Sequence, residues 1–148
     1  MPVVQRVPSV AAEAGVGIVH LGLGAFHRAH QAVYLQRHLN RHGQSQWGLC
    51  SANLRSNRAL VELLREQQGR YCVAEYRDRE QVTLRDITVV REALYVGDGG
   101  AELELLLQHM AAPGTRIVTL TVTEKGYYLS PATGQLQVQA PAIVHDLA

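Results

Sequence analysis

The segment that most constrains the fold is Gly17–Tyr34, GIVHLGLGAFHRAHQAVY. Its first half is apolar and predicts a short buried strand over Gly17–Gly22. The chain then breaks at Gly22-Leu23-Gly24, and the apolar residues that follow have the spacing of a helix, which we place over Phe26–Asn40. A strand, a glycine turn and a helix in this order open a βαβ unit, so the chain is expected to build a parallel sheet.

The two glycines of this turn are spaced as in a loop that binds the phosphates of a dinucleotide. Gly22 permits a sharp turn, and Gly24, which has no Cβ, permits close approach of the backbone to a phosphate. The N-terminus of the following helix presents N–H groups to the anion. The full fingerprint is G-x-G-x-x-G, but its third position here holds His27. On spacing alone, a dinucleotide loop and an ordinary strand–turn–helix are therefore equal alternatives.

Strands and helices alternate through most of the remaining chain. The expected elements are a strand over Trp47–Asn53, a helix over Asn57–Gln68 capped by Ser56, a β-hairpin over Arg70–Tyr76 and Gln81–Val90, a strand over Leu94–Val96, a helix over Ala101–Ala112 and a buried strand over Arg116–Thr123. Asp98-Gly99-Gly100 is interpreted as a helix N-cap, not as a second phosphate loop. Residues 1–16 are expected to be a flexible leader. The predicted fold class is α/β, a Rossmann-like, doubly wound, mainly parallel sheet with a β-hairpin insertion.

Composition and charge exclude several kinds of partner. The 148 residues carry a formal net charge of +1, and the arginines are scattered among acidic residues, so nucleic acid and anionic membranes are not expected partners. No apolar run approaches the roughly 20 residues of a membrane span, and the first residues lack a secretory signal pattern, so a cytoplasmic protein is expected. His27, His30 and His38 lack the additional ligands that a zinc site needs, and no metal site is assigned.

Longer strings in the sequence are more specific than the glycines. Besides residues 17–34, they are WGLCSANLR at Trp47–Arg55 and IVTLTVTEKGYY at Ile117–Tyr128. In order and spacing, all three resemble the polyol-specific long-chain dehydrogenases, the mannitol dehydrogenase family. The run TEKGYYLSPATGQL resembles the fructuronate reductase (D-mannonate oxidoreductase) branch more than the mannitol branch. By this resemblance, the NAD-binding segment comprises Ile18, Val19, His20, Leu21, Gly22, Leu23, Gly24, Ala25, Phe26, His27, Arg28 and Ala29.

The resemblance implies reversible hydride transfer between NAD and a secondary alcohol of a sugar acid or sugar alcohol. D-mannonate and D-fructuronate are the expected pair, with mannitol and fructose as the alternative. The family's catalytic lysine lies in a K-x4-N-x2-H motif of a C-terminal domain, whereas Lys125, the only lysine here, is followed by Ser130 and Thr133 at those positions. Residues 17–148 are therefore expected to be an incomplete cofactor domain without catalytic residues, without turnover of its own, and able to use a hexuronate or polyol only with the missing domain. A non-catalytic nucleotide-binding or interaction module is the alternative, and apolar surface left uncovered would favour self-association.

The residues that would select the cofactor follow the predicted second strand. An NAD site of this fold usually has an acidic residue there, which binds the ribose 2′-hydroxyl. This chain has Asn53, which can bind a hydroxyl, and Arg55 and Arg58, which can bind a 2′-phosphate or stack on adenine. The side chains of Arg55 and Arg58 weakly favour NADP, whereas the family resemblance favours NAD. We take NAD as the cofactor and keep NADP as the alternative.

Thr123 and Glu124 follow the last predicted strand. Ligands of parallel sheets bind beyond the carboxyl ends of the strands, so both residues are expected to approach the nicotinamide. A solvated turn at the end of the strand is the equal alternative.

Overall fold

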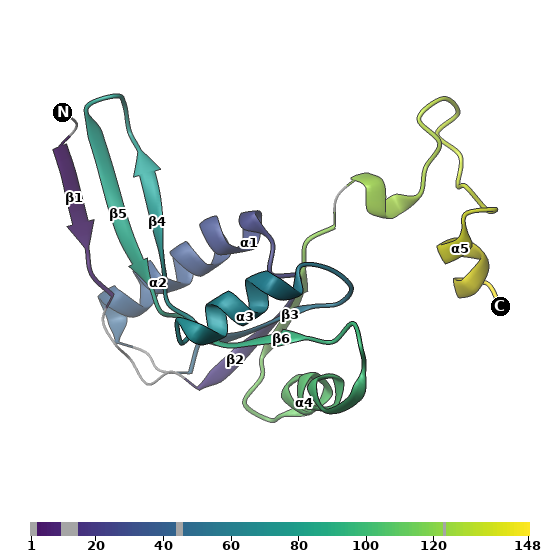
Figure 1. The fold of residues 1–148 in the computed structure, drawn as a ribbon, viewed down its shortest axis with the longest axis horizontal. Coiled ribbons are helices and arrows are strands. Elements are labelled where there is room, and N and C mark those ends of the chain that lie inside the picture. The colour runs from purple at the N-terminus through teal and green to yellow at the C-terminus, as the bar shows by residue number, and fades with distance from the viewer. Residues whose placement is uncertain (1–2, 10–14, 44–45, 123) are drawn as a thin grey trace.

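The computed structural model describes residues 3–9, 15–43, 46–122 and 124–148, and Figure 1 shows their arrangement. In chain order the elements are β1 (Val3–Val7), β2 (Val16–Leu21), α1 (Ala25–Ala29), α2 (Gln31–His42), β3 (Gly48–Asn53), α3 (Arg58–Glu66), β4 (Tyr71–Tyr76), β5 (Gln81–Ile87), β6 (Val90–Tyr95), α4 (Gly100–Ala111), β7 (Ile117–Leu120), the 3-10 helix η1 (Glu124–Tyr127) and α5 (Pro141–Asp146).

Four parallel strands form the central sheet in the order β6-β3-β2-β7. After β2, the chain adds β3 and then β6 on one side, and it returns to add β7 on the other side of β2. This is the order of the first four strands of a Rossmann fold, and the direction of winding reverses between β2 and β7. The predicted α/β class and the parallel, doubly wound sheet are confirmed.

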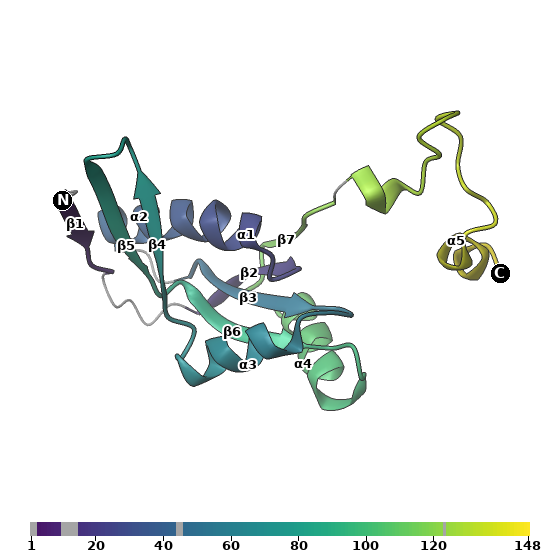
Figure 2. The same ribbon diagram turned by 45° about the horizontal axis from the view of Figure 1, so that its top comes forward.

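Helices cover both faces of this sheet (Figure 2). The side chain of Ile18 on β2 packs among residues of α2, whereas the next residue, Val19, packs with Leu106 of α4. In the same way, Ala93 on β6 contacts α3, and Leu94 contacts the cluster around α4. Because side chains alternate across a strand, α2 and α3 lie on one face and α4 lies on the other.

A second sheet has the order β1-β5-β4. The predicted hairpin is confirmed, because β4 and β5 pair antiparallel. Within the expected flexible leader of residues 1–16, Val3–Val7 forms strand β1, which pairs parallel with β5. Arg6 of β1 forms an ion pair with Asp86 of β5 at 3.0 Å. Sequence periodicity misses this strand because nearly all its residues are exposed, so apolar and polar residues do not alternate.

The predicted N-cap of α3 at Ser56 is wrong, whereas the predicted N-cap of α4 within Asp98-Gly99-Gly100 is confirmed. Backbone conformation, not a capping side chain, starts both helices. The N-cap of α3 is Asn57 in the left-handed region at φ 63°, not Ser56. The N-cap of α4 is Gly99, and neither residue makes a side-chain cap hydrogen bond. The carboxylate of Asp98 instead forms an ion pair with Arg58.

The last predicted strand exists as β7, but it is not buried. Ile117 and Val118 are each 43% exposed and Leu120 is 60% exposed. The β-branched run predicts a strand correctly but does not determine its position, and the strand order places β7 at the edge of the sheet. Of the two cysteines, Cys50 is buried and Cys72 is exposed.

Beyond β7 the chain runs away from the sheet in both views (Figures 1 and 2). It contains η1, an antiparallel bridge between Leu129 and Leu136, and α5. The sequence did not predict α5, which has Pro141 at its start and no fully buried residue. Tertiary packing therefore contributes little to this segment.

Gly69 provides a stability test of the packing between α3 and β6. Its φ is +74°, and a Cβ there would lie 2.0 Å from the carbonyl oxygen of Val90. Gly43, at φ +64°, has open space at the Cβ position. We expect Gly43→Ala to lower the free energy of unfolding by about 1 kcal/mol through its left-handed backbone alone. Gly69→Ala should lower it by about 2 kcal/mol more, because a rigid backbone oxygen must move. Urea unfolding measures both, and equal losses would contradict the close approach.

Candidate functional site

The glycine turn after β2 is held against the end of β3 by two short hydrogen bonds. Gly22, at φ 113°, donates its backbone N–H to the carbonyl oxygen of Ala52 at 2.7 Å. The next N–H, of Leu23, donates to Oδ1 of Asn53 at 2.7 Å. The Leu23 side chain is fully buried among residues of α3 and β6. The turn is therefore anchored by backbone, by a side-chain amide and by packing.

Gly24 stands on the open side of this turn. It is the N-cap residue of α1, with an extended backbone, and a Cβ built on it meets no atom within 4 Å. A glycine with free space beside its backbone lets a ligand come close to the peptide groups. The first N–H groups of a helix have no acceptor within the helix, so they are available to such a ligand.

Arg28 folds back over the turn. Its Nη1 donates to the carbonyl oxygen of Leu23 at 2.6 Å, and its own carbonyl oxygen accepts from the hydroxyl of Tyr71 at 2.9 Å. Burial raises the pKa of Tyr71, which keeps this hydroxyl a donor. A guanidinium charge is therefore held beside the loop from its own helix.

Beneath α1, a row of polar side chains crosses the sheet. Ser51 of β3, His20 of β2 and Thr119 of β7 are register partners, so their side chains lie on the same face. Nδ1 of His20 lies 2.7 Å from the hydroxyl of Thr119. The imidazole of His27 stacks on His20 with ring centroids 3.8 Å apart. The row and His27 together form a buried polar network under the loop.

The hydrogen bonds of His27 define its tautomer. Nδ1 is 2.9 Å from Oε1 of Gln31, which can only accept, so Nδ1 carries the proton. Nε2 is 2.9 Å from the hydroxyl of Ser51 and therefore accepts from it. Burial, with the neighbouring His20, lowers the pKa of His27 to about 4, and burial lowers the pKa of His20 as well. Both imidazoles are neutral at neutral pH.

The predicted helix over Phe26–Asn40 is wrong in one respect, because it is divided into two helices just after His27. The third glycine of the fingerprint permits close packing of the helix on the strand. Here that position carries an imidazole that is 1% exposed and lies between α1 and the sheet. The helix breaks at His30 and resumes as α2.

The other residues of the predicted cofactor segment have different surroundings. Ile18 and Val19 belong to the core of β2, Leu21 is partly buried beside it, and Phe26 is 62% exposed and stacks on His30. Ala25 and Ala29 lie exposed on α1.

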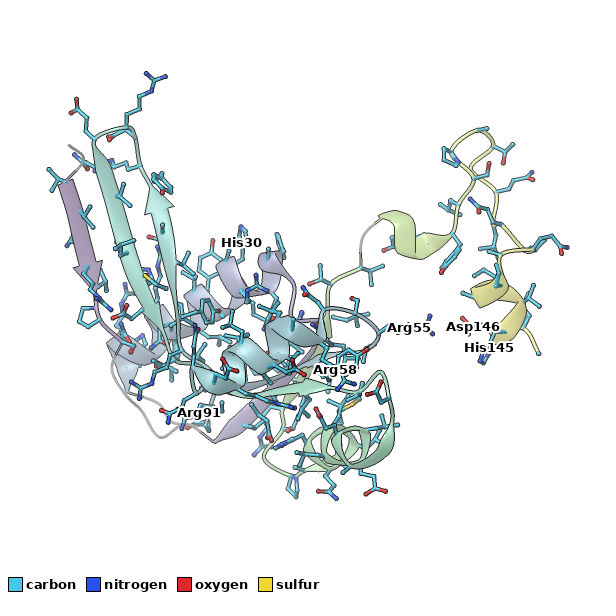
Figure 3. The ribbon with its side chains drawn as sticks, viewed as in Figure 1. His30, Arg55, Arg58, Arg91, His145 and Asp146 are labelled. Carbon is cyan, nitrogen blue, oxygen red and sulfur yellow. The ribbon has the colours of Figure 1, made fainter. Side chains whose placement is uncertain are left out.

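The residues expected at the end of β3 take up different positions. Asn53 lies at the loop, where Oδ1 accepts from Leu23 and Nδ2 donates to the carbonyl oxygen of Asn57 at 3.4 Å. Arg55 projects from the loop after β3 (Figure 3). Arg58 instead lies 4.5 Å from the ring centroid of Tyr95. Thr123 lies outside the described residues.

Three residues of the site were not predicted. Gln31 and Ser51 bind the two ring nitrogens of His27, and Thr119 binds His20 and accepts from Nε2 of Gln31 at 3.3 Å. The sequence places them in a helix and two strands. Only the register of the sheet shows that the two strand residues flank His20 on one face.

The loop and the polar row lie where the strand order reverses. In open parallel sheets, ligands bind beyond the carboxyl ends of the strands at this reversal. A pocket of about 590 Å³ lies elsewhere, at the outer edge of β6 between α3 and α4. It is lined by charged side chains such as Arg65 and Glu102, which pair with each other, and it does not include the loop.

Together, the strand order and the glycine loop at its reversal define a Rossmann-type α/β domain. Comparison with known proteins identifies the family. The family model described as the mannitol dehydrogenase Rossmann domain matches residues 16–148. The chain therefore belongs to the mannitol dehydrogenase family, which confirms the resemblance found in the sequence.

Individual relatives are similar over nearly the whole chain. D-mannonate oxidoreductase of Escherichia coli K12 is 49% identical over 132 residues, which are 88% of this chain and 26% of that protein. Mannitol 2-dehydrogenase of Pyricularia oryzae is 38% identical, with the same coverage. The solved ternary complex of Pseudomonas fluorescens mannitol 2-dehydrogenase with NAD and D-mannitol superposes with a TM-score of 0.79 at 33% identity. The superposition covers 99% of this chain and 30% of the mannitol 2-dehydrogenase chain. The chain thus spans about a quarter of the length of the curated relatives it matches.

In the part that the structure describes, no helix has the length and apolar character needed to cross a membrane.

The buried, neutral His27 predicts a pH dependence of stability. Its folded-state pKa of about 4 lies below the ordinary 6.5, so the unfolded chain binds the proton more readily. Stability is complete above pH 6.5 and falls as the pH is lowered towards 4, by on the order of 3 kcal/mol. Urea unfolding across this range measures the loss. His27→Gln should flatten the curve, and the control His145→Gln, an exposed histidine, should not; the wild-type slope in His27→Gln would contradict the prediction.

Proposed function

We propose that this chain is the cofactor-binding part of an oxidoreductase that transfers a hydride between NAD and a secondary alcohol of a sugar acid or sugar alcohol. The observation that carries the proposal is the anchored turn Gly22–Gly24 at the reversal of the strand order. Membership of the mannitol dehydrogenase family and the NAD complex of a similar structure support it.

In this proposal, the cofactor pyrophosphate lies over Leu23–His27. Gly24 leaves room for the phosphates, the first N–H groups of α1 donate to them, and Arg28 contributes a positive charge from beside the loop. The neutral imidazoles of His20 and His27 support the loop from below without adding charge. NAD itself supplies the hydride chemistry, and the protein holds and orients it.

For the substrate we propose the pair D-mannonate and D-fructuronate, with mannitol and fructose as the alternative. The higher identity to D-mannonate oxidoreductase, 49% against 38% for a mannitol 2-dehydrogenase, supports this choice. Substrate contacts and the lysine that accepts the hydroxyl proton are proposed to come from the part of the relatives that this chain does not match. The protein is proposed to act in the cytoplasm.

The structure bears on the choice between NAD and NADP through the arginines after β3. Arg58 is engaged by the carboxylate of Asp98 and by the ring of Tyr95. Arg55 projects from the loop after β3 (Figure 3), so one arginine of the pair is already engaged within the protein, which weakens the case for a 2′-phosphate. We propose NAD as the preferred cofactor.

Titration with NADH, followed by energy transfer from Trp47, tests the loop. The 148 residues are expected to bind NADH weakly and saturably. Gly24→Ala should fold normally, because its Cβ has free space, but should bind NADH about tenfold or more weakly, since the methyl group displaces a phosphate. Gly15→Ala is the matched control, with equally free space and no change in affinity expected.

Three results would overturn parts of this assignment. Equal NADH affinity of wild type and Gly24→Ala, or no saturable binding at all, would contradict the phosphate loop. Tighter binding of NADPH than of NADH would contradict the choice of NAD. Oxidation of D-mannonate by these 148 residues alone would contradict the placement of proton transfer elsewhere.

An interaction module is the second candidate function, and the exposed edge strand β7 favours it. Its apolar side chains and its unpaired edge are suited to association with another chain. We expect the 148 residues to self-associate with rising concentration in sedimentation velocity, and Leu120→Lys to reduce this association. Val138→Lys, at a residue 50% exposed outside the sheet, is the control and should behave as wild type. A monomeric wild type at all concentrations would contradict the expectation.

A further inference from the structure

Three potential metal ligands converge on the face of the sheet opposite to the loop. They are Sγ of Cys50 on β3, a carboxylate oxygen of Glu92 on β6 and a ring nitrogen of His109 on α4, and all lie within 4.8 Å of one another. The three histidines weighed from the sequence are not part of this group. His27 and His30 have their own partners, on Gln31, Ser51 and the carbonyl oxygen of Phe26.

The fold brings the three side chains together for simple reasons. Cys50 and Glu92 are register partners on neighbouring parallel strands, so both side chains project from the same face. That face is the one covered by α4, where Leu106 is buried in a cluster with Cys50. His109 is three residues after Leu106 and therefore lies on the same side of the helix.

The donor set fits a zinc ion. Zn²⁺ is bound by thiolate, imidazole and carboxylate ligands, and it is four-coordinate, so these three side chains leave one position for a water molecule. A thiolate disfavours magnesium and calcium, which take oxygen ligands. Nε2 of His109 already hydrogen-bonds to Oε2 of Glu92, so two of the three donors face one another.

The cluster is exposed on one side, where an ion can enter, and buried on the other, where solvent is excluded. Cys50 is fully buried, while the side chains of Glu92 and His109 remain 32% and 21% exposed. Glu92 also lines the pocket of about 590 Å³ at the edge of β6.

We propose that Cys50, Glu92 and His109 form a zinc site that ties helix α4 to strands β3 and β6. The helix has a structural use for such a link, because Leu106 is its only fully buried residue. Leu103, Leu107 and Met110 are each more than a third exposed. An ion at His109 fixes the last turn of the helix to the sheet.

Cobalt(II) is the probe, because thiolate ligation gives an intense charge-transfer absorption in the near ultraviolet. The wild type is expected to show this band with one Co²⁺ per chain, and Zn²⁺ should abolish it by displacement. Cys50→Ala should remove the band, whereas Cys72→Ala, at the exposed cysteine, should keep it. His109→Gln should weaken binding about tenfold or more, and the control His145→Gln should not.

The alternative is a buried thiol beside an ordinary histidine–glutamate pair. Absence of the band in the wild type, or its survival in Cys50→Ala, would establish that alternative and overturn the proposal. If Cys50→Ala fails to fold, the comparison of His109→Gln with His145→Gln decides, because His109 is partly exposed. NADH binding should be the same in His109→Gln and wild type, so the metal site and the cofactor loop are tested independently.

Discussion

The site depends on the pair of hydrogen bonds that fastens the glycine turn to the end of β3. Gly22 donates to Ala52 at the end of the ladder between β2 and β3, and its φ of 113° then turns the chain sharply away from β2. Leu23 then presents its N–H to Asn53, and its side chain enters the core beside α3. A buried N–H without this acceptor would cost about 1–3 kcal/mol. The amide of Asn53 thus gives the loop a defined shape before any ligand arrives.

His27 occupies the third glycine position of the G-x-G-x-x-G fingerprint and changes how α1 packs on the sheet. A glycine at this position would let α1 lie close to β2, but the imidazole fills that space and is bonded at both nitrogens. Buried polar groups are tolerated when every donor and acceptor is satisfied. Among the described residues, each buried side-chain nitrogen and oxygen has a partner. The buried imidazole under the short helix α1 is therefore accommodated by a satisfied polar network.

Much of the fold was predictable from the sequence because its signals are local. The glycine turn, the hairpin and the amphipathic helix over 101–112 are each read from spacing within a few residues. Strand β1, the edge position of β7 and the row of Ser51, His20 and Thr119 depend on pairing between segments far apart in the chain. Spacing carries no signal for such pairings. The cap at Ser56 failed because backbone conformation, not a side chain, starts that helix.

The alternation of side chains along β3 separates two kinds of chemistry. Ser51 faces α1 and takes part in the polar network beneath the loop, while its neighbour Cys50 faces α4 and Glu92. Because adjacent residues of a strand point to opposite faces, one strand can support a dinucleotide loop on one side and a thiol ligand on the other without the two sharing a residue. The edge strand β7 carries exposed apolar side chains, and no further strand in the described part of the chain pairs with its outer edge.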